Sequence, residues 1–126
     1  MFKLNLFNMI VQRDIHTIDA EGKAPGRVAS EAATFLIGKH KVDFVSNIDA
    51  GDHVQVVNAS KMKVDDNKME QKVYYHHTTY AQGLRQVTMK RLFEKDPSEI
   101  IRRAVSRMLP KNKQRTERMK RLTVKN

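Results

Sequence analysis

The order strand, helix, strand in the first half of the chain is the feature that most restricts its fold. Residues 13–20 (RDIHTIDA) place Ile15 and Ile18 among polar residues and indicate a strand that runs into a turn-rich loop. Residues 27–37 (RVASEAATFLI) put apolar side chains on one helical face, and residues 53–59 (HVQVVNA) contain the β-branched run of a covered strand. This order favours a βαβ unit and therefore an α/β fold.

Residues with capping chemistry mark where the predicted helices begin and end. Gly38 follows the first helix and is a suitable C-cap. Thr88 is an N-cap for a short helix that buries its apolar side chains. Asp96, Pro97 and Glu99 provide an N-cap, a first-turn proline and a capping-box acid for a longer helix. We therefore expect two consecutive helices after residue 88.

The longer helix is predicted to be amphipathic and to end before Pro110. Its apolar face consists of Ile100, Ile101, Ala104, Val105, Met108 and Leu109. Arg102, Arg103 and Arg107 fall on the opposite face. The helix therefore anchors to a core while it presents cations outward.

Residues 71–77 (QKVYYHH) predict a further strand, after a charged connection at 61–69 and before a loop at 78–83. Rings and cations gather in this region: Tyr74, Tyr75, His76, His77 and Tyr80 are interleaved with Lys68, Lys72 and Arg85. RNA recognition commonly uses rings for stacking beside cations for phosphates. The alternative is ordinary strand packing with polar ring edges exposed, in which Tyr75 belongs to the core.

The positive charge is concentrated at the C-terminal end of the chain. The 126 residues carry a formal net charge of +10. From residue 102 onward there are ten Lys and Arg against one acid, Glu117, so this quarter accounts for +9 of that charge. Such segregation points to a polyanionic partner, because lysine and arginine neutralise phosphates and release condensed counterions.

Residues 110–126 have little to bury, because Met119 and Leu122 form only a narrow apolar stripe. We expect this basic extension to take its order from a partner. The whole chain fits a single domain, with an extended lead at 1–12 that is too short and too interrupted by polar residues to cross a membrane.

Several kinds of chemistry find little support in the sequence. The chain has no cysteine, which excludes disulfides and thiolate metal sites. The loop at 19–27 (DAEGKAPGR) matches neither the P-loop nor the dinucleotide fingerprint, so an RNA phosphate at Lys23 or Arg27 is the better interpretation. The histidines show no metal-ligand spacing on a predicted helix, and Asp49 to Asp52 read as a turn. We predict no catalytic residue, no metal and no cofactor.

Taken together, a set of sequence blocks resembles the universal ribosomal protein L13 family of the large subunit, in its bacterial form. The blocks keep the family's order: DAEGKAPGRVASEAA (19–33), GKHK (38–41), DAGD (49–52), NASK (58–61), NKMEQKVYYHH (67–77), MLPKNK (108–113) and MKRL (119–122). They span nearly the whole chain from Arg13 onward.

The resemblance implies an α/β fold, a three-layer α/β/α sandwich around a mixed sheet of about four strands, with the basic helical extension at 110–126. It implies a structural constituent of the large ribosomal subunit in the cytoplasm, with no enzymatic activity, membrane or small-molecule substrate. The expected partners are large-subunit ribosomal RNA and neighbouring ribosomal proteins, with messenger RNA as a further candidate through autoregulation.

Residues carried over by position, together with the cations of the last quarter, form the predicted RNA-binding set. It consists of Lys23, Arg27, Lys39, His40, Lys41, Lys68, Lys72, Tyr75, His76, His77, Arg102, Arg103, Arg107, Lys111, Lys113, Arg115, Arg118, Lys120 and Arg121. The alternatives are a free regulatory RNA-binding module and a small phosphate-using enzyme. On the charge pattern alone, deletion after Leu109 is expected to leave the body folded but to prevent incorporation into subunits.

Overall fold

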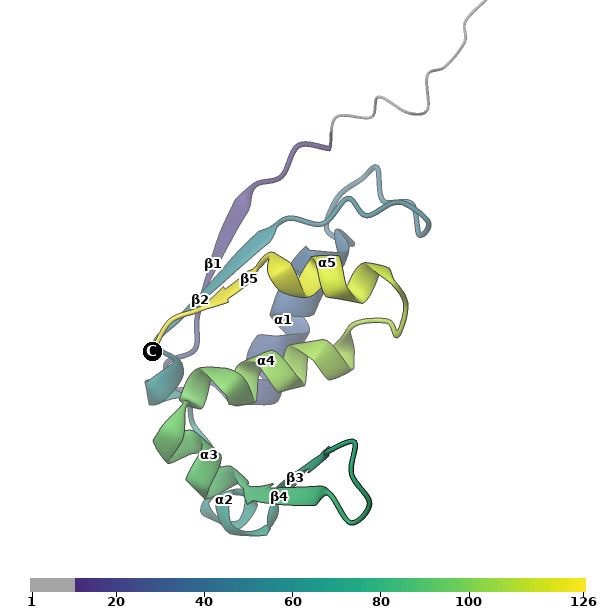
Figure 1. The fold of residues 1–126 in the computed structure, drawn as a ribbon. Helices are drawn as coiled ribbons and strands as arrows, with labels where there is room; N and C mark the ends of the chain where they lie inside the picture. The colour runs from purple at the N-terminus through teal and green to yellow at the C-terminus, as the bar shows by residue number, and fades with distance from the viewer. Residues whose placement is uncertain (1–10) are drawn as a thin grey trace, which may run out of the picture.

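The chain folds around a short parallel sheet that carries helices on one face (Figure 1). The structure, a computed structural model, describes residues 11–126. The predicted lead at 1–12 lies outside this range except for its last two residues. Strand β1 (Ile15–Asp19), helix α1 (Pro25–Ile37) and strand β2 (His53–Val57) follow one another, and the two strands pair in parallel. The predicted βαβ unit and α/β fold are therefore confirmed.

The sheet has three strands in the order β1-β2-β5, where β5 (Leu122–Val124) pairs in parallel with β2. The register aligns Ile18, Val56 and Val124 across the sheet, and all three are buried. Ile15, on the opposite face, is 72% exposed. The expected mixed sheet of four strands is thus wrong. A second layer of helices is absent among residues 11–126, because helices cover only the face that holds the alternating buried residues.

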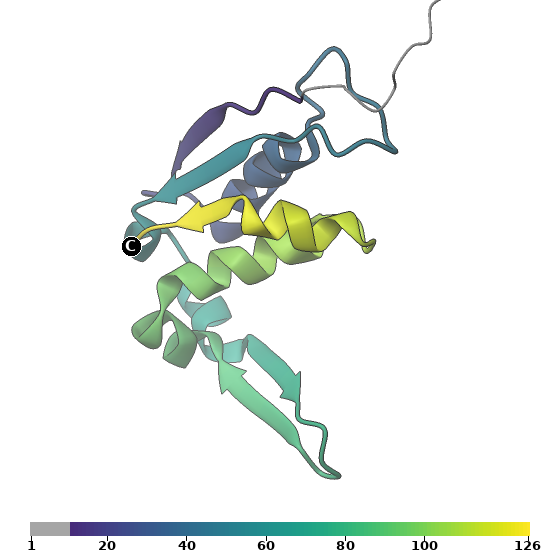
Figure 2. The same ribbon diagram turned by 45° about the horizontal axis from the view of Figure 1, so that its top comes forward.

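The strand predicted at 71–77 belongs to a separate hairpin that extends away from the body (Figure 2). Strand β3 (Val73–His77) pairs in antiparallel fashion with β4 (Leu84–Thr88), which sequence reasoning did not predict. Tyr74 is 3% exposed and Tyr75 is 61% exposed, so the alternative in which Tyr75 belongs to the core is wrong. The hairpin therefore turns Tyr74 toward the helices and Tyr75 toward solvent.

Helix α1 begins and ends where its local chemistry dictates. Pro25 occupies the first turn, where its fixed φ suits a helix and its missing N–H costs nothing. Gly38 ends the helix with a φ of 89°, a left-handed conformation, and its N–H donates to the Thr34 carbonyl at 3.1 Å. The helix starts two residues before the predicted residue 27, and the predicted C-cap is confirmed.

The two helices predicted after residue 88 are present as α3 (Met89–Lys95) and α4 (Pro97–Met108). The Thr88 hydroxyl accepts from the Arg91 N–H, and the Asp96 carboxylate accepts from the Ser98 N–H at 3.1 Å, so both N-caps are confirmed. Glu99 does not act as a capping-box acid, because its carboxylate accepts from Arg103 Nε at 2.9 Å.

The connection at 61–69 contains regular structure that its charged composition did not reveal. A short 3-10 turn, η2 (Ala59–Lys61), precedes helix α2 (Asp66–Gln71), which leads directly into the hairpin. No helix among residues 11–126 has the length and apolarity needed to cross a membrane.

The basic extension packs onto the body, in contrast to the prediction that a partner would order it. Helix α5 (Gln114–Lys120) leads into β5, where Leu122 and Val124 are 7% and 8% exposed. The strand adds backbone hydrogen bonds to β2, including Val54 N–H to the Arg121 carbonyl at 3.1 Å. The end of the chain therefore completes the sheet and the core.

Candidate nucleic-acid interface

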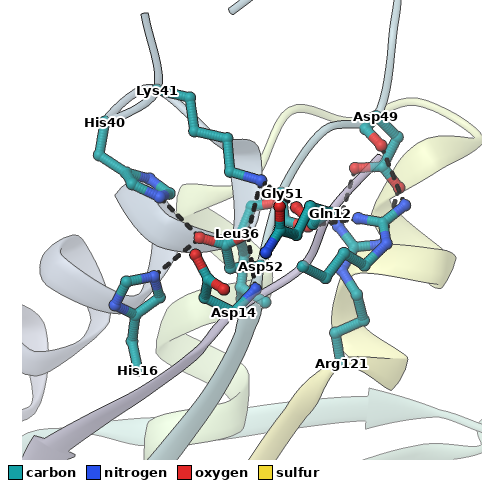
Figure 3. A network of polar contacts seen from close by, with 11 residues as sticks. Gln12, Asp14, His16, Leu36, His40, Lys41, Asp49, Gly51, Asp52 and Arg121 are labelled. Atoms are coloured by element: carbon teal, nitrogen blue, oxygen red, sulfur yellow. Dashed lines mark hydrogen bonds and ion pairs between the residues drawn. The ribbon is translucent and has the colours of Figure 1, made fainter. Parts of the chain in front are cut away.

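Asp52, immediately before β2, is fully buried and is surrounded by cationic and polar groups from other segments (Figure 3). Its Oδ2 accepts from His16 Nε2 and His40 Nε2, both at 2.7 Å. Its Oδ1 lies 2.6 Å from Lys41 Nζ. The GKHK block after α1 is thereby tied to the starts of β1 and β2.

The hydrogen bonds determine the charge state of Asp52. Burial alone would raise its pKa, but hydrogen bonds from Lys41, His16, the Asp14 N–H and His40 hold the pKa well below its usual range. The ligand atoms of His16, His40 and Asp52 lie within 4.8 Å of one another, which is compatible with holding a metal ion. Because Lys41 already supplies a positive charge to this carboxylate, the contacts are explained by a structural ion cluster.

A second buried network joins Asp49 to the end of the chain. Arg121 binds its carboxylate through both terminal nitrogens, at 2.7 and 2.8 Å, and also donates to the Leu36 carbonyl at 3.1 Å at the end of α1. Arg118 Nε lies 3.5 Å from the same carboxylate. The side chains of Arg118 and Arg121 are only 3% and 9% exposed.

This burial argues against the predicted RNA contacts of Arg118 and Arg121. A guanidinium that a carboxylate and a helix carbonyl hold in the interior is not free to bind an RNA phosphate. Gly51 makes this arrangement possible, because a Cβ there would lie 1.7 Å from the Leu36 carbonyl oxygen. The DAGD and MKRL blocks are therefore parts of one structural contact.

Most of the other predicted RNA-binding residues keep accessible side chains. Lys23, Arg27, Lys39, Lys68, Tyr75, His76, His77, Arg102, Arg107, Lys111, Lys113 and Lys120 are exposed, and the side chains of His40, Lys41, Lys72, Arg103 and Arg115 are half-buried. Asp52 binds the His40 ring and the Lys41 ammonium, so the first role of these two side chains is to stabilise the fold.

The structure brings several of these cations together around one buried ring. Lys72 Nζ, Arg103 Cζ and Arg107 Cζ lie 5.3, 5.2 and 5.8 Å from the centroid of the Tyr74 ring. The hairpin and helix α4 thus form one continuous cationic region, which we call the hairpin–α4 surface. Its members are Lys68, Lys72, Arg103 and Arg107. The exposed Tyr75 lies on the opposite face of β3 from Tyr74.

The predicted RNA-binding set leaves out further cations of this region, among them Arg85, which the sequence places beside the rings of the hairpin. Arg85 lies opposite His76 in the hairpin, and Lys90 and Arg91 follow on α3, where all three are exposed. The signal was available, because residues 71–93 contain no aspartate or glutamate. Tyr80, also left out of the predicted set, is 80% exposed in the loop between β3 and β4.

Comparison with known proteins decides the family. The family model described as ribosomal protein L13 matches residues 13–125. The chain belongs to the ribosomal protein L13 family. This membership confirms the predicted family and makes the chain a structural ribosomal protein of the large subunit, located with the ribosome in the cytoplasm, rather than an enzyme.

Bacterial L13 proteins are similar over most of the chain. A large ribosomal subunit protein uL13 from Clostridioides difficile is 49% identical over 114 residues, which cover 90% of this chain and 80% of that protein. The uL13 of Chloroflexus aggregans is 50% identical over 103 residues, covering 82% and 72%. The uL13 of Thermotoga petrophila is 45% identical over 114 residues, covering 90% and 76%.

Proposed function

We propose that this L13 protein binds large-subunit ribosomal RNA through its exposed cations and rings, and that this binding supports subunit assembly and translation. The observation that carries the proposal is the hairpin–α4 surface, where Lys72, Arg103 and Arg107 gather around the Tyr74 ring. The hairpin and the start of α3, residues 71–93, add further cations and exposed rings and contain no carboxylate. Phosphate contacts of this kind supply most of the affinity of RNA-binding proteins and position them on the RNA.

The exposed lysines of the extension form a second part of the proposed interface. Lys111 and Lys113 lie in the connection between α4 and α5, and Lys120 lies at the end of α5. Lys120 has only a surface ion pair with Glu117, in which both side chains are more than 60% exposed. Such pairs contribute little to stability, so these lysines are free to exchange a solvent-exposed partner for a phosphate.

Replacing Lys111, Lys113 and Lys120 by glutamine is expected to weaken binding to large-subunit ribosomal RNA by about tenfold at moderate salt. Each lost phosphate contact reduces the slope of log affinity against log salt by about 0.7–0.9, so the slope should fall by roughly 2 to 3. Filter binding over a salt series measures both quantities. The matched control replaces Lys61, Lys63 and Lys95, which are exposed outside the proposed interface. Equal losses in the two triple variants would contradict this assignment.

The cellular form of the protein separates the ribosomal role from a free regulatory module. A structural constituent should co-sediment with large subunits in roughly stoichiometric amount, whereas a mainly free pool would support the regulatory alternative. The same cations would also accept a structured messenger RNA, so autoregulation remains a prediction. Competition between ribosomal RNA and the protein's own messenger RNA for the purified protein tests it.

A further inference from the structure

A small cavity opens between the start of α1, helix α2, strand β3 and helix α4. Its volume is about 200 Å³. Tyr74, Met89 and Ile100 contribute apolar walls, and each of them is at most 3% exposed. Lys68, Lys72 and Arg107 also line it. The cavity therefore combines a buried apolar wall with three cations, which come from α2, from the junction between α2 and β3, and from α4.

These cations have no carboxylate to balance them. None of the ion pairs among residues 11–126 includes Lys68, Lys72 or Arg107. The acids in these pairs are Glu21, Glu31, Asp49, Asp52, Glu99 and Glu117. The contrast with Asp52 is informative, because there the chain supplies its own anion to the surrounding cations. At this cavity the described part of the chain supplies cations without an anion.

The three cations are close enough to affect one another. Lys72 Nζ and Arg107 Cζ both lie within 6 Å of the Tyr74 centroid. Burial lowers the pKa of Lys72, and the positive charges of Arg107 and Lys68 lower it further. An anion placed among them would relieve this repulsion, and it would restore the pKa of the Lys72 ammonium.

The first turn of α1 adds to the positive potential of the cavity. Pro25 and Gly26 line it, and the turn contains no acidic residue. Ala24 precedes the helix without a side-chain hydrogen bond to the helix N–H groups. The positive end of the 13-residue helix therefore acts in the same direction as the three cations.

We propose that this cavity binds one phosphate group, and that in the ribosome the phosphate belongs to the RNA backbone. This assignment rests on the proposed RNA binding and refines it, because it picks out one phosphate position instead of a diffuse charged surface. Lys72 and Arg107 bind the phosphate oxygens directly, and Lys68 closes the outer side. The buried ring of Tyr74 fixes the positions of Lys72 and Arg107 before RNA arrives.

Titration of the ¹⁵N-labelled full chain with inorganic phosphate, at constant ionic strength, tests the cavity by NMR. Saturable shifts are expected at amides around residues 25, 72 and 107. The double variant Lys72→Gln with Arg107→Gln should bind phosphate at least tenfold more weakly. The control Lys63→Gln with Lys95→Gln removes the same charge at exposed positions outside the proposed interface and should change the affinity less than twofold. The charge-conserving variant Lys72→Arg with Arg107→Lys should retain binding if the cations act on phosphate. Thermal unfolding identifies any variant that has lost its fold.

Ribosomal RNA added to the phosphate-loaded protein separates the two sources of phosphate. Displacement of phosphate from the wild-type cavity by large-subunit ribosomal RNA supports the proposal. Saturable phosphate binding that RNA does not displace overturns the backbone assignment. Equal weakening in the two double variants, or no saturable binding while RNA still binds, overturns the cavity but leaves the proposed function intact. Failure of the wild-type chain to bind ribosomal RNA is instead a failure of the proposed function.

Discussion

Deletion of the chain after Leu109 is expected to unfold the body, not merely to remove an RNA-binding extension. The deletion removes β5 and leaves one side of β2 without its backbone partners. It also removes Leu122 and Val124 from the core, at a cost of about 1.5–3 kcal/mol each. These losses reach on the order of 5 kcal/mol, which is comparable to the whole stability of a small domain.

Loss of Arg121 adds to this effect by a different mechanism. Asp49 would keep its charge in a half-buried position without the bidentate guanidinium, and the Leu36 carbonyl would lose a donor. Circular dichroism and urea unfolding of residues 1–109 measure the outcome. A cooperative transition close to that of the full chain would contradict the structural role of the extension.

A matched full-length variant separates folding from charge. Replacing Lys111, Lys113 and Lys120 by glutamine removes exposed cations of the extension but keeps the buried residues of α5 and β5. We expect this variant to unfold within about 0.5 kcal/mol of the wild type, because such surface substitutions rarely cost more. The expectation that the truncated body stays folded came from charge alone, and the packing of β5 argues against it.

Local signals in the sequence were sufficient for α1, α3 and α4. Each of these helices has an apolar face with the helical period and a terminus with capping chemistry, such as Gly38 or Asp96. The pairing of β1 with β2 also followed from the βαβ order. These elements depend on contacts that lie close together in sequence or follow a general rule of topology.

Long-range contacts explain what the sequence did not reveal. Residues 114–121 have no broad apolar stripe, and Arg121 gains its place from Asp49, 72 residues earlier in the chain. Strand β4 is 5 residues long, and its side chains do not alternate between buried and exposed. It is a strand because it pairs with β3, not because one of its faces packs on the core. The sequence also did not decide which face of β3 is buried, because Tyr74 and Tyr75 are chemically alike. Only the packing of Tyr74 against helix α4 distinguishes them.

The candidate interface, like the fold, was predictable from the sequence only in part. Charge segregation was enough to predict a polyanionic partner, and many of the predicted cations are exposed. Which cations are structural could not be read from charge, because Arg118 and Lys120 are two residues apart yet one is buried and the other is exposed. The helical face decides this difference, and the face depends on where α5 docks.

The substitution Asp52→Asn is expected to reduce the free energy of unfolding by about 2–3 kcal/mol at pH 7. The amide keeps the shape of the side chain but removes the charge that His16, His40 and Lys41 share. The estimate lies below the usual cost of breaking a buried ion pair, since these three partners are 22–28% exposed and solvent screens them. Urea unfolding of the two proteins measures the difference, with Asp43→Asn at an exposed position as the control.

The difference in the free energy of unfolding between wild type and Asp52→Asn should become smaller as the pH falls. The pKa of Asp52 is depressed in the folded chain, so the unfolded chain takes up the proton first as the pH falls. The stabilisation by Asp52 is therefore fully present above about pH 5 and declines below about pH 4, where an unfolded aspartate titrates. The two free energies of unfolding should therefore approach each other between pH 5 and pH 3. A gap that stays constant or widens over this interval would show that the charge of Asp52 does not stabilise the fold.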